Sequence, residues 1–233
     1  MGNPEGPHAL ACELVGSVLA DWLGLTTLDF CLVEVGEDDE IPFLKGGTAS
    51  PGPAFISKAE QKAFPWGGTA KELRLIINPH EISGLVAMDT WTLNYDRCAP
   101  DGRRVNRDNV LLIQCGRKAR LVAMDFTHAF RQGGDINRRL SFIERIRDEK
   151  VYGLFPEFTD FLDRELVAGF CLRLGQFRRS TAEEAIDLVP RAWEVDRDGR
   201  SAWATLITER AHFVSETLQS ILWPQMDLEG GTE

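Results

Sequence analysis

The spacing of the apolar residues changes partway along this chain, and this change most limits the folds that it can adopt. Two apolar runs at 110–114 and 119–124 flank a polar segment with Gly116, which predicts two strands joined by a tight turn. From about residue 135 onward, apolar residues recur at three- and four-residue steps, which predicts helices at 137–149, 158–175, 181–188 and 200–223. Such segregation excludes the regular strand–helix alternation of a doubly wound sheet. We therefore expect an α+β fold with two unequal parts.

The first third of the sequence predicts a long helix at 8–24, which Gly24 would end, and paired strands at 30–35 and 54–57. Further along, a helix is predicted at 82–94, and the segment 181–184 has the pattern of a capping box. One face of the first helix carries small residues and a single carboxylate, namely Ala9, Glu13, Gly16, Ser17 and Ala20. Since small residues allow another backbone to approach, this face is either covered by further structure or half-buried with few charges by chance.

Composition narrows the classes of function. The 233 residues include 26 Lys and Arg against 36 Asp and Glu, a formal net charge of −10 that repels the phosphates of nucleic acids and anionic lipids. We therefore expect neither specific nucleic-acid binding nor membrane association. The N-terminus has no secretory signal pattern, and the five cysteines are scattered and form no CxxC pair. These features favour a soluble cytoplasmic protein with reduced thiols.

Polar side chains collect at the open end of the predicted central hairpin. Asn109 precedes its first strand and Asp125 follows its second, so the hairpin brings them together, and Asp96 lies on the loop that leads there. Magnesium in phosphoryl transfer takes carboxylate, amide and phosphate oxygens. This set predicts Asn109 and Asp125 as magnesium ligands and Asp96 as the base that accepts a hydroxyl proton. Arg97, beside that base, would screen the charge on a phosphate.

Plainer interpretations of these residues are also open. Asp and Asn are common in loops because they bond to their own backbone, and this alone would explain all three. His128 lies between two phenylalanines and is predicted to be a packed side chain rather than a ligand. The loop after Asp96 contains Arg103, Arg104 and Arg107, which either bind an acidic or phosphorylated partner or form a solvated charged loop.

A longer pattern resembles the HipA-like kinase domain family, whose catalytic segments are related to those of lipid kinases. Its Asp-x-Trp-x-x-Asn-x-Asp-Arg segment is matched at 89–97, the Asn before an apolar strand at 109–112, and the Asp that closes the hairpin at 124–130. A Leu- and Ala-rich helix that ends in a GLP-type turn is matched at 13–25, and 190–193 also looks similar. The resemblance extends over about residues 9 to 222.

The resemblance implies a protein-kinase-like, two-lobed fold, with a truncated N-lobe at 1–60 and a mainly helical, catalytic C-lobe at 61–233. It implies an ATP- and Mg²⁺-dependent phosphotransferase that acts on a protein Ser or Thr. Adenine would lie between the lobes near Phe55 and Ser57. Glu13 would be the helix glutamate that pairs with an ATP-anchoring lysine.

Three departures from the family pattern qualify these expectations. Asp96 and Asn109 are thirteen residues apart instead of five, so either the additional loop bulges out and its ends still meet, or Asn106 is the amide ligand. Thr127 stands where a DFG-type segment has Gly. Because no Lys precedes Glu13, the phosphate loop and its lysine are expected to be missing, and a partner chain or sequence further upstream would supply them. Otherwise the chain would be a pseudokinase or a partner-binding subunit.

Overall fold

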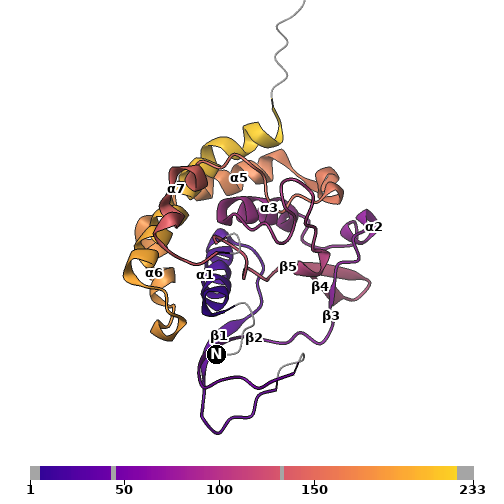
Figure 1. The fold of residues 1–233 in the computed structure, drawn as a ribbon. Coiled ribbons are helices and arrows are strands. Elements are labelled where there is room, and N and C mark those ends of the chain that lie inside the picture. The colour runs from indigo at the N-terminus through magenta and orange to yellow at the C-terminus, as the bar shows by residue number, and fades with distance from the viewer. Residues whose placement is uncertain (1–5, 43–45, 132–133, 225–233) are drawn as a thin grey trace, which may run out of the picture.

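A computed structural model describes residues 6–42, 46–131 and 134–224. Figure 1 shows helix α1 (Pro7–Leu23) in the middle of the molecule, with α5 (Arg164–Gly175) and α7 (Arg197–Leu222) along one side. The small antiparallel sheets and many helices confirm the predicted α+β class. The other helices and 3-10 turns (η) of the described residues are α2 (Ala70–Leu73), α3 (His80–Thr92), α4 (Ile143–Ile146), α6 (Arg179–Asp187), η1 (Arg107–Asn109), η2 (Arg138–Ser141), η3 (Pro156–Phe161) and η4 (Arg191–Trp193). A short strand, β3 (Ala63–Pro65), pairs with the strand at 110–115.

The first two strands form a sheet of their own. β1 (Phe30–Val35) and β2 (Gly52–Ser57) pair in antiparallel fashion, as predicted. The rings of Phe30 and Phe55 stack across this pair with 5.4 Å between their centroids. The β1–β2 hairpin lies below α1 in Figure 1, apart from the second sheet.

The second sheet contains the predicted central hairpin. β4 (Val110–Cys115) and β5 (Lys118–Ala123) pair around Gly116, whose φ of 65° suits a glycine in a tight turn. The first residue of β4 lies opposite the last residue of β5. Their neighbours Asn109 and Met124 therefore lie together at the open end of the hairpin.

Helix α1 starts one residue before its predicted start and ends at Gly24, whose φ is 88°. Its small-residue face is covered by this chain itself: Ser17 is buried, and a Cβ on Gly16 would lie 2.3 Å from the Cβ of Phe126. Of the two alternatives for this face, the first is therefore correct: further structure covers it, and that structure is part of this chain. The segment after β5 packs directly on the α1 backbone, and only a residue without a Cβ permits that approach.

One prediction for the helical half is wrong, and a distant arginine binds the segment where the second helical piece ends. Instead of one helix at 137–149, η2 and α4 are separated by Phe142, whose ψ is 140°. The Arg210 guanidinium donates hydrogen bonds to the carbonyl oxygens of Arg145 and Asp148, at 2.7 and 3.1 Å. A carbonyl that is bonded to Arg210 is less available to the N–H groups of a continuing helix.

The other helix starts also differ from the sequence pattern. The predicted 158–175 helix begins only at Arg164, because the Asp163 carboxylate accepts hydrogen bonds from two backbone N–H groups at 2.8 and 3.0 Å and caps α5 there. The capping box expected at Thr181 is wrong, since α6 begins two residues earlier. A capping box forms instead in α2, between Thr69 and Glu72.

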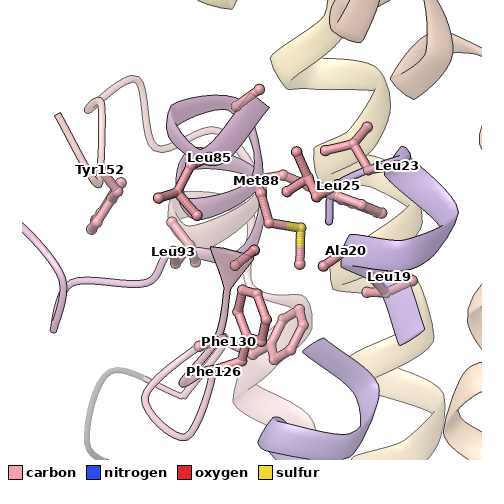
Figure 2. Packing of buried hydrophobic residues seen from close by; sticks show 14 of the residues in the cluster. Leu19, Ala20, Leu23, Leu25, Leu85, Met88, Leu93, Phe126, Phe130 and Tyr152 are labelled. Carbon is pink, nitrogen blue, oxygen red and sulfur yellow. The ribbon is translucent and has the colours of Figure 1, made fainter. Parts of the chain in front are cut away.

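One continuous core joins α1, α3, the β4–β5 hairpin and the C-terminal helices, and it crosses the boundary predicted near residue 60. Figure 2 shows Met88 of α3 directed toward α1, with Ala20 on one side and the rings of Phe126 and Phe130 below. The Trp91 indole of α3 donates to a carbonyl oxygen of α7 at 2.8 Å. Within the described ranges, no helix has the length and apolar character needed to cross a membrane.

Candidate active site

The additional loop after Asp96 forms a small hairpin. Cys98 and Val105 make an antiparallel bridge at its base. Directly after it, the Asn106 N–H donates to the Arg97 carbonyl oxygen at 2.9 Å. The loop therefore bulges out and returns to its starting point, which is the first of the two alternatives that the sequence left open.

The Asp96 carboxylate is buried, with 4% of the residue exposed; one oxygen is hydrogen-bonded and the other takes part only in an ion pair. The Asn109 side-chain amide donates to Oδ2 at 2.8 Å, and the Asn106 amide donates to the same oxygen at 3.2 Å. The other oxygen, Oδ1, forms an ion pair with the Arg104 guanidinium. Both asparagines named from the sequence thus reach the predicted base, and together they hold its carboxylate in one orientation.

Arg97 is fully buried and joins three segments. Its Nε donates to the Asp89 carboxylate at 2.7 Å, one Nη donates to the Met124 carbonyl oxygen at 2.7 Å, and the other binds the Asn109 carbonyl oxygen. Burial raises the pKa of Asp89, while the charge of Arg97 acts in the opposite direction. Because its guanidinium is bonded inside the protein, Arg97 is placed to hold the loop against the hairpin and not, as the sequence predicted, to meet a phosphate.

Asp125 follows β5 with a φ of 59°, in the left-handed region that Asp tolerates better than most residues. Its Oδ1 accepts a hydrogen bond from the Thr127 hydroxyl at 2.7 Å, so the residue in place of the expected Gly orients the carboxylate. The next backbone N–H, of Phe126, donates to the Glu13 carboxylate at 2.5 Å. Burial, and then the charge of Asp125, raises the pKa of Glu13 from 4.5 to about 7. Helix α1 therefore fixes the backbone beside the predicted metal ligand.

The oxygen donors at the open end of the hairpin fit Mg²⁺ by their chemistry. Asp125 offers a carboxylate and Asn109 an amide oxygen, and both are hard ligands. The Asn109 oxygen accepts a hydrogen bond from the Asn106 amide at 3.0 Å, a bond that would open on coordination. In the described part of the chain, no three His, Cys, Asp or Glu side chains cluster as a metal site. An ion here would therefore depend on the amide oxygen and on oxygens of a substrate.

Three residues predicted to face a nucleotide line one cavity. Glu13, Phe55 and Ser57 meet there with Met124, between α1, the β1–β2 hairpin and the end of β5. Its volume is about 30 Å³, which is the share of one water molecule in the liquid and far less than a purine base needs. The structure brings these residues together but leaves room for adenine only if the β1–β2 hairpin moves.

A larger cavity, which the sequence did not predict, is bordered by Tyr95, the residue directly before the predicted base. Its volume is about 320 Å³, and its lining includes Tyr95, Pro100, Lys150 and Tyr152. The Tyr95 hydroxyl lies 3.3 Å from the His128 Nδ1, so His128 is a packed, hydrogen-bonded side chain as predicted. An aromatic residue directly before the base was the one signal in the sequence for this cavity.

The three arginines of the loop have three different environments. The Arg107 side chain donates to Glu157 at 2.7 Å. Arg103 has 89% of its side chain exposed, as expected for a solvated charged loop. Arg104 reaches Asp96, and nothing in the sequence distinguished it from its two neighbours.

Two comparisons bear on the whole chain. A family model described as HipA-like kinase matches residues 2–224. A comparison with curated proteins finds no match. The matched range includes every site residue described above.

Proposed function

This chain belongs to the HipA-like kinase family, and from that premise we propose that it is an ATP- and Mg²⁺-dependent kinase that phosphorylates a hydroxyl group, a Ser or Thr of a protein. The observation that carries the proposal is the pair of amides on Asp96, at 2.8 and 3.2 Å, at the open end of the hairpin that Asp125 closes. The formal charge of −10 favours a protein over a nucleic acid as the acceptor.

Asp96 is the proposed base. Asn106 and Asn109 occupy Oδ2, which leaves Oδ1 as the oxygen that would receive the acceptor proton. A positioned base contributes about 10²–10⁴-fold to rate. The fixed orientation of this carboxylate supports that role because a base must lie within hydrogen-bond reach of the proton that it takes.

Asn109 and Asp125 are the proposed magnesium ligands. The bound ion would neutralise charge on the phosphates during transfer. Arg97 is proposed as a positioning residue, since it binds the carbonyl oxygens of Asn109 and Met124 and so holds the two ligand-bearing segments together. Glu13 supports the second segment through the Phe126 N–H.

We also propose that the β1–β2 hairpin belongs to a small lobe at 1–60 and that nucleotide enters by opening this hairpin. Adenine would then lie near Phe55 and Ser57, which already line the cavity next to Met124. A lysine for Glu13 would come from a protein partner that completes this lobe.

Transfer of label from γ-labelled ATP to a mixture of Ser- and Thr-containing peptides tests the proposed function. We expect Mg²⁺-dependent transfer by the unchanged protein, reduced about 100-fold or more in Asp96→Asn. Asp187→Asn, an exposed substitution at the end of α6, is the matched control and should transfer at the unchanged rate. Equal rates for Asp96→Asn and the control would contradict the assignment of the base.

A second candidate is a partner-binding subunit without phosphotransfer. The small cavity near Glu13 favours it, because a pocket of about 30 Å³ takes no purine. The two candidates differ in nucleotide binding: the kinase binds ATP with Mg²⁺, and the subunit does not.

A further inference from the structure

Arg104 occupies the one oxygen of Asp96 that an acceptor would need. Oδ2 already accepts two amide hydrogen bonds, and Oδ1 is paired with the Arg104 guanidinium. A guanidinium has only donors, so it cannot relay the proton of a hydroxyl to the carboxylate. An acceptor hydroxyl can therefore reach Oδ1 only after Arg104 has left it.

Arg104 can leave without movement of its loop. Its carbonyl oxygen accepts from the Ala99 N–H at 2.9 Å, so its backbone is fixed within the small hairpin. Its side chain is 50% exposed and lies over the Tyr95 ring, with 5.1 Å between the guanidinium carbon and the ring centroid. The Asp96 end of the pair is buried, with 5% of its side chain exposed, but Asn106 and Asn109 keep their hydrogen bonds to this carboxylate when the Arg104 side chain rotates away.

A transferring phosphoryl group lies within reach of that rotation. The base lies about 3 Å from the acceptor oxygen, and that oxygen lies about 3–3.5 Å from the phosphorus that it attacks. A cation paired with the base is thus one acceptor atom away from the phosphorus. Of the three loop arginines, Arg104 is the one paired with the proposed base. Arg107 is bonded to Glu157 at 2.7 Å, and Arg103 is exposed to solvent.

We propose that Arg104 is a further catalytic residue, which rests on the base at Asp96 in the free protein and moves to the γ-phosphoryl group when ATP binds. The inference rests on the proposed kinase function. As Arg104 leaves Oδ1, the acceptor oxygen bonds to the γ-phosphorus and its proton passes to Asp96. The bond from the phosphorus to the bridging oxygen breaks, and its electron pair stays with ADP. Arg104 stabilises the charge on the transferring group, as an arginine supplied within the chain does in other phosphotransferases.

Calorimetric titration of ATP and of ADP, each with Mg²⁺, tests the proposal without any turnover. The unchanged protein should bind ATP more tightly than ADP, because only ATP has the γ-phosphoryl group. Arg104→Ala should lose about tenfold in affinity for ATP and keep its affinity for ADP within about twofold. Arg104→Lys, which keeps the charge but not the fork, should fall between these values. Arg103→Ala is the matched control and should resemble the unchanged protein.

Two results would overturn the proposal, and they differ from each other. An unchanged ratio of ATP to ADP affinity in Arg104→Ala would show that Arg104 does not contact the γ-phosphoryl group, while the proposed kinase function would stand. Absence of binding of either nucleotide to the unchanged protein would remove the proposed function and this inference with it. Circular dichroism of each variant confirms folding, and Arg104→Lys decides the ratio should Arg104→Ala not fold.

Discussion

Two arginine–aspartate pairs lie side by side in this molecule and have opposite environments. Arg97 and Asp89 are both completely buried, and Nε lies 2.7 Å from the carboxylate. Arg104 and Asp96 pair at the edge of the same loop, where the arginine side chain is 50% exposed. The chemistry of the two contacts is the same, so burial and additional partners make the difference.

The difference in burial suits the buried pair to a structural role and the Arg104–Asp96 pair to a role in the proposed reaction. The first pair bonds to backbone on both sides of the β4–β5 hairpin, and moving it would leave charges in the core without partners. The second pair can exchange its arginine for a substrate, because the Arg104 side chain is half-exposed and no other carboxylate or buried carbonyl oxygen among the described residues holds its guanidinium. The buried Arg97–Asp89 pair thus supports the loop that contains the Arg104–Asp96 pair, whose arginine can be replaced.

Arg97→Ala should produce the largest effect. It leaves the Asp89 carboxylate buried without its cation and removes both bonds to the hairpin ends. Breaking a buried pair in this way costs about 3–5 kcal/mol of unfolding free energy. Urea denaturation measures this value, and a loss below about 1 kcal/mol would show that the pair is not the support described here.

Glu13→Gln sharpens the comparison because Glu13 is a carboxylate held by backbone N–H groups. The folded protein binds the Glu13 proton more tightly than the unfolded chain does, since the pKa rises from 4.5 to about 7. The unfolding free energy therefore falls as pH rises between these values, by about 1.4 kcal/mol per unit of pKa and roughly 3 kcal/mol in all.

A Gln side chain has no ionisable group, so the stability of Glu13→Gln has no such contribution from position 13. Relative to the unchanged protein, Glu13→Gln should gain stability between pH 4 and pH 8, with most of the gain between pH 4.5 and 7. Urea denaturation of both proteins across this range measures the difference. A constant difference in stability would contradict the raised pKa of Glu13.

Arg104→Ala should have the smallest effect on stability. Asn106 and Asn109 still hold Asp96 in this variant, and the arginine side chain that it loses is half-exposed, so water can replace it. We expect a change within about 1 kcal/mol by urea denaturation. A loss as large as that of Arg97→Ala would mean that both pairs are structural and would end the contrast between them.

The residues at the two hairpin ends were predictable because local pattern decides where they lie. Asn109 and Asp125 flank alternating apolar runs around Gly116, and strand pairing then fixes their position. The bridge between Cys98 and Val105 gave no such signal, so the sequence left the return of the loop as one of two alternatives and could not predict the place of Arg104.

Long-range contacts account for the failures. The helix expected at 137–149 does not continue beyond Ile146, where Arg210, more than sixty residues away, bonds to the carbonyl oxygens of Arg145 and Asp148. The burial of Arg97 depends on Asp89 and on the hairpin ends together, and spacing alone cannot distinguish a buried arginine from a phosphate-binding one. Local periodicity contains no information about such partners.

Calorimetric titration of ATP, with and without Mg²⁺, into the unchanged protein and Asp125→Asn is the most direct test of the kinase site. Asn tolerates the φ of 59° at this position, so the variant removes the charge and keeps the backbone. The account predicts Mg²⁺-dependent binding to the unchanged protein and an affinity that is reduced about tenfold or more in the variant. Absence of binding to the unchanged protein, or equal Mg²⁺-dependent affinity in both proteins, would contradict it.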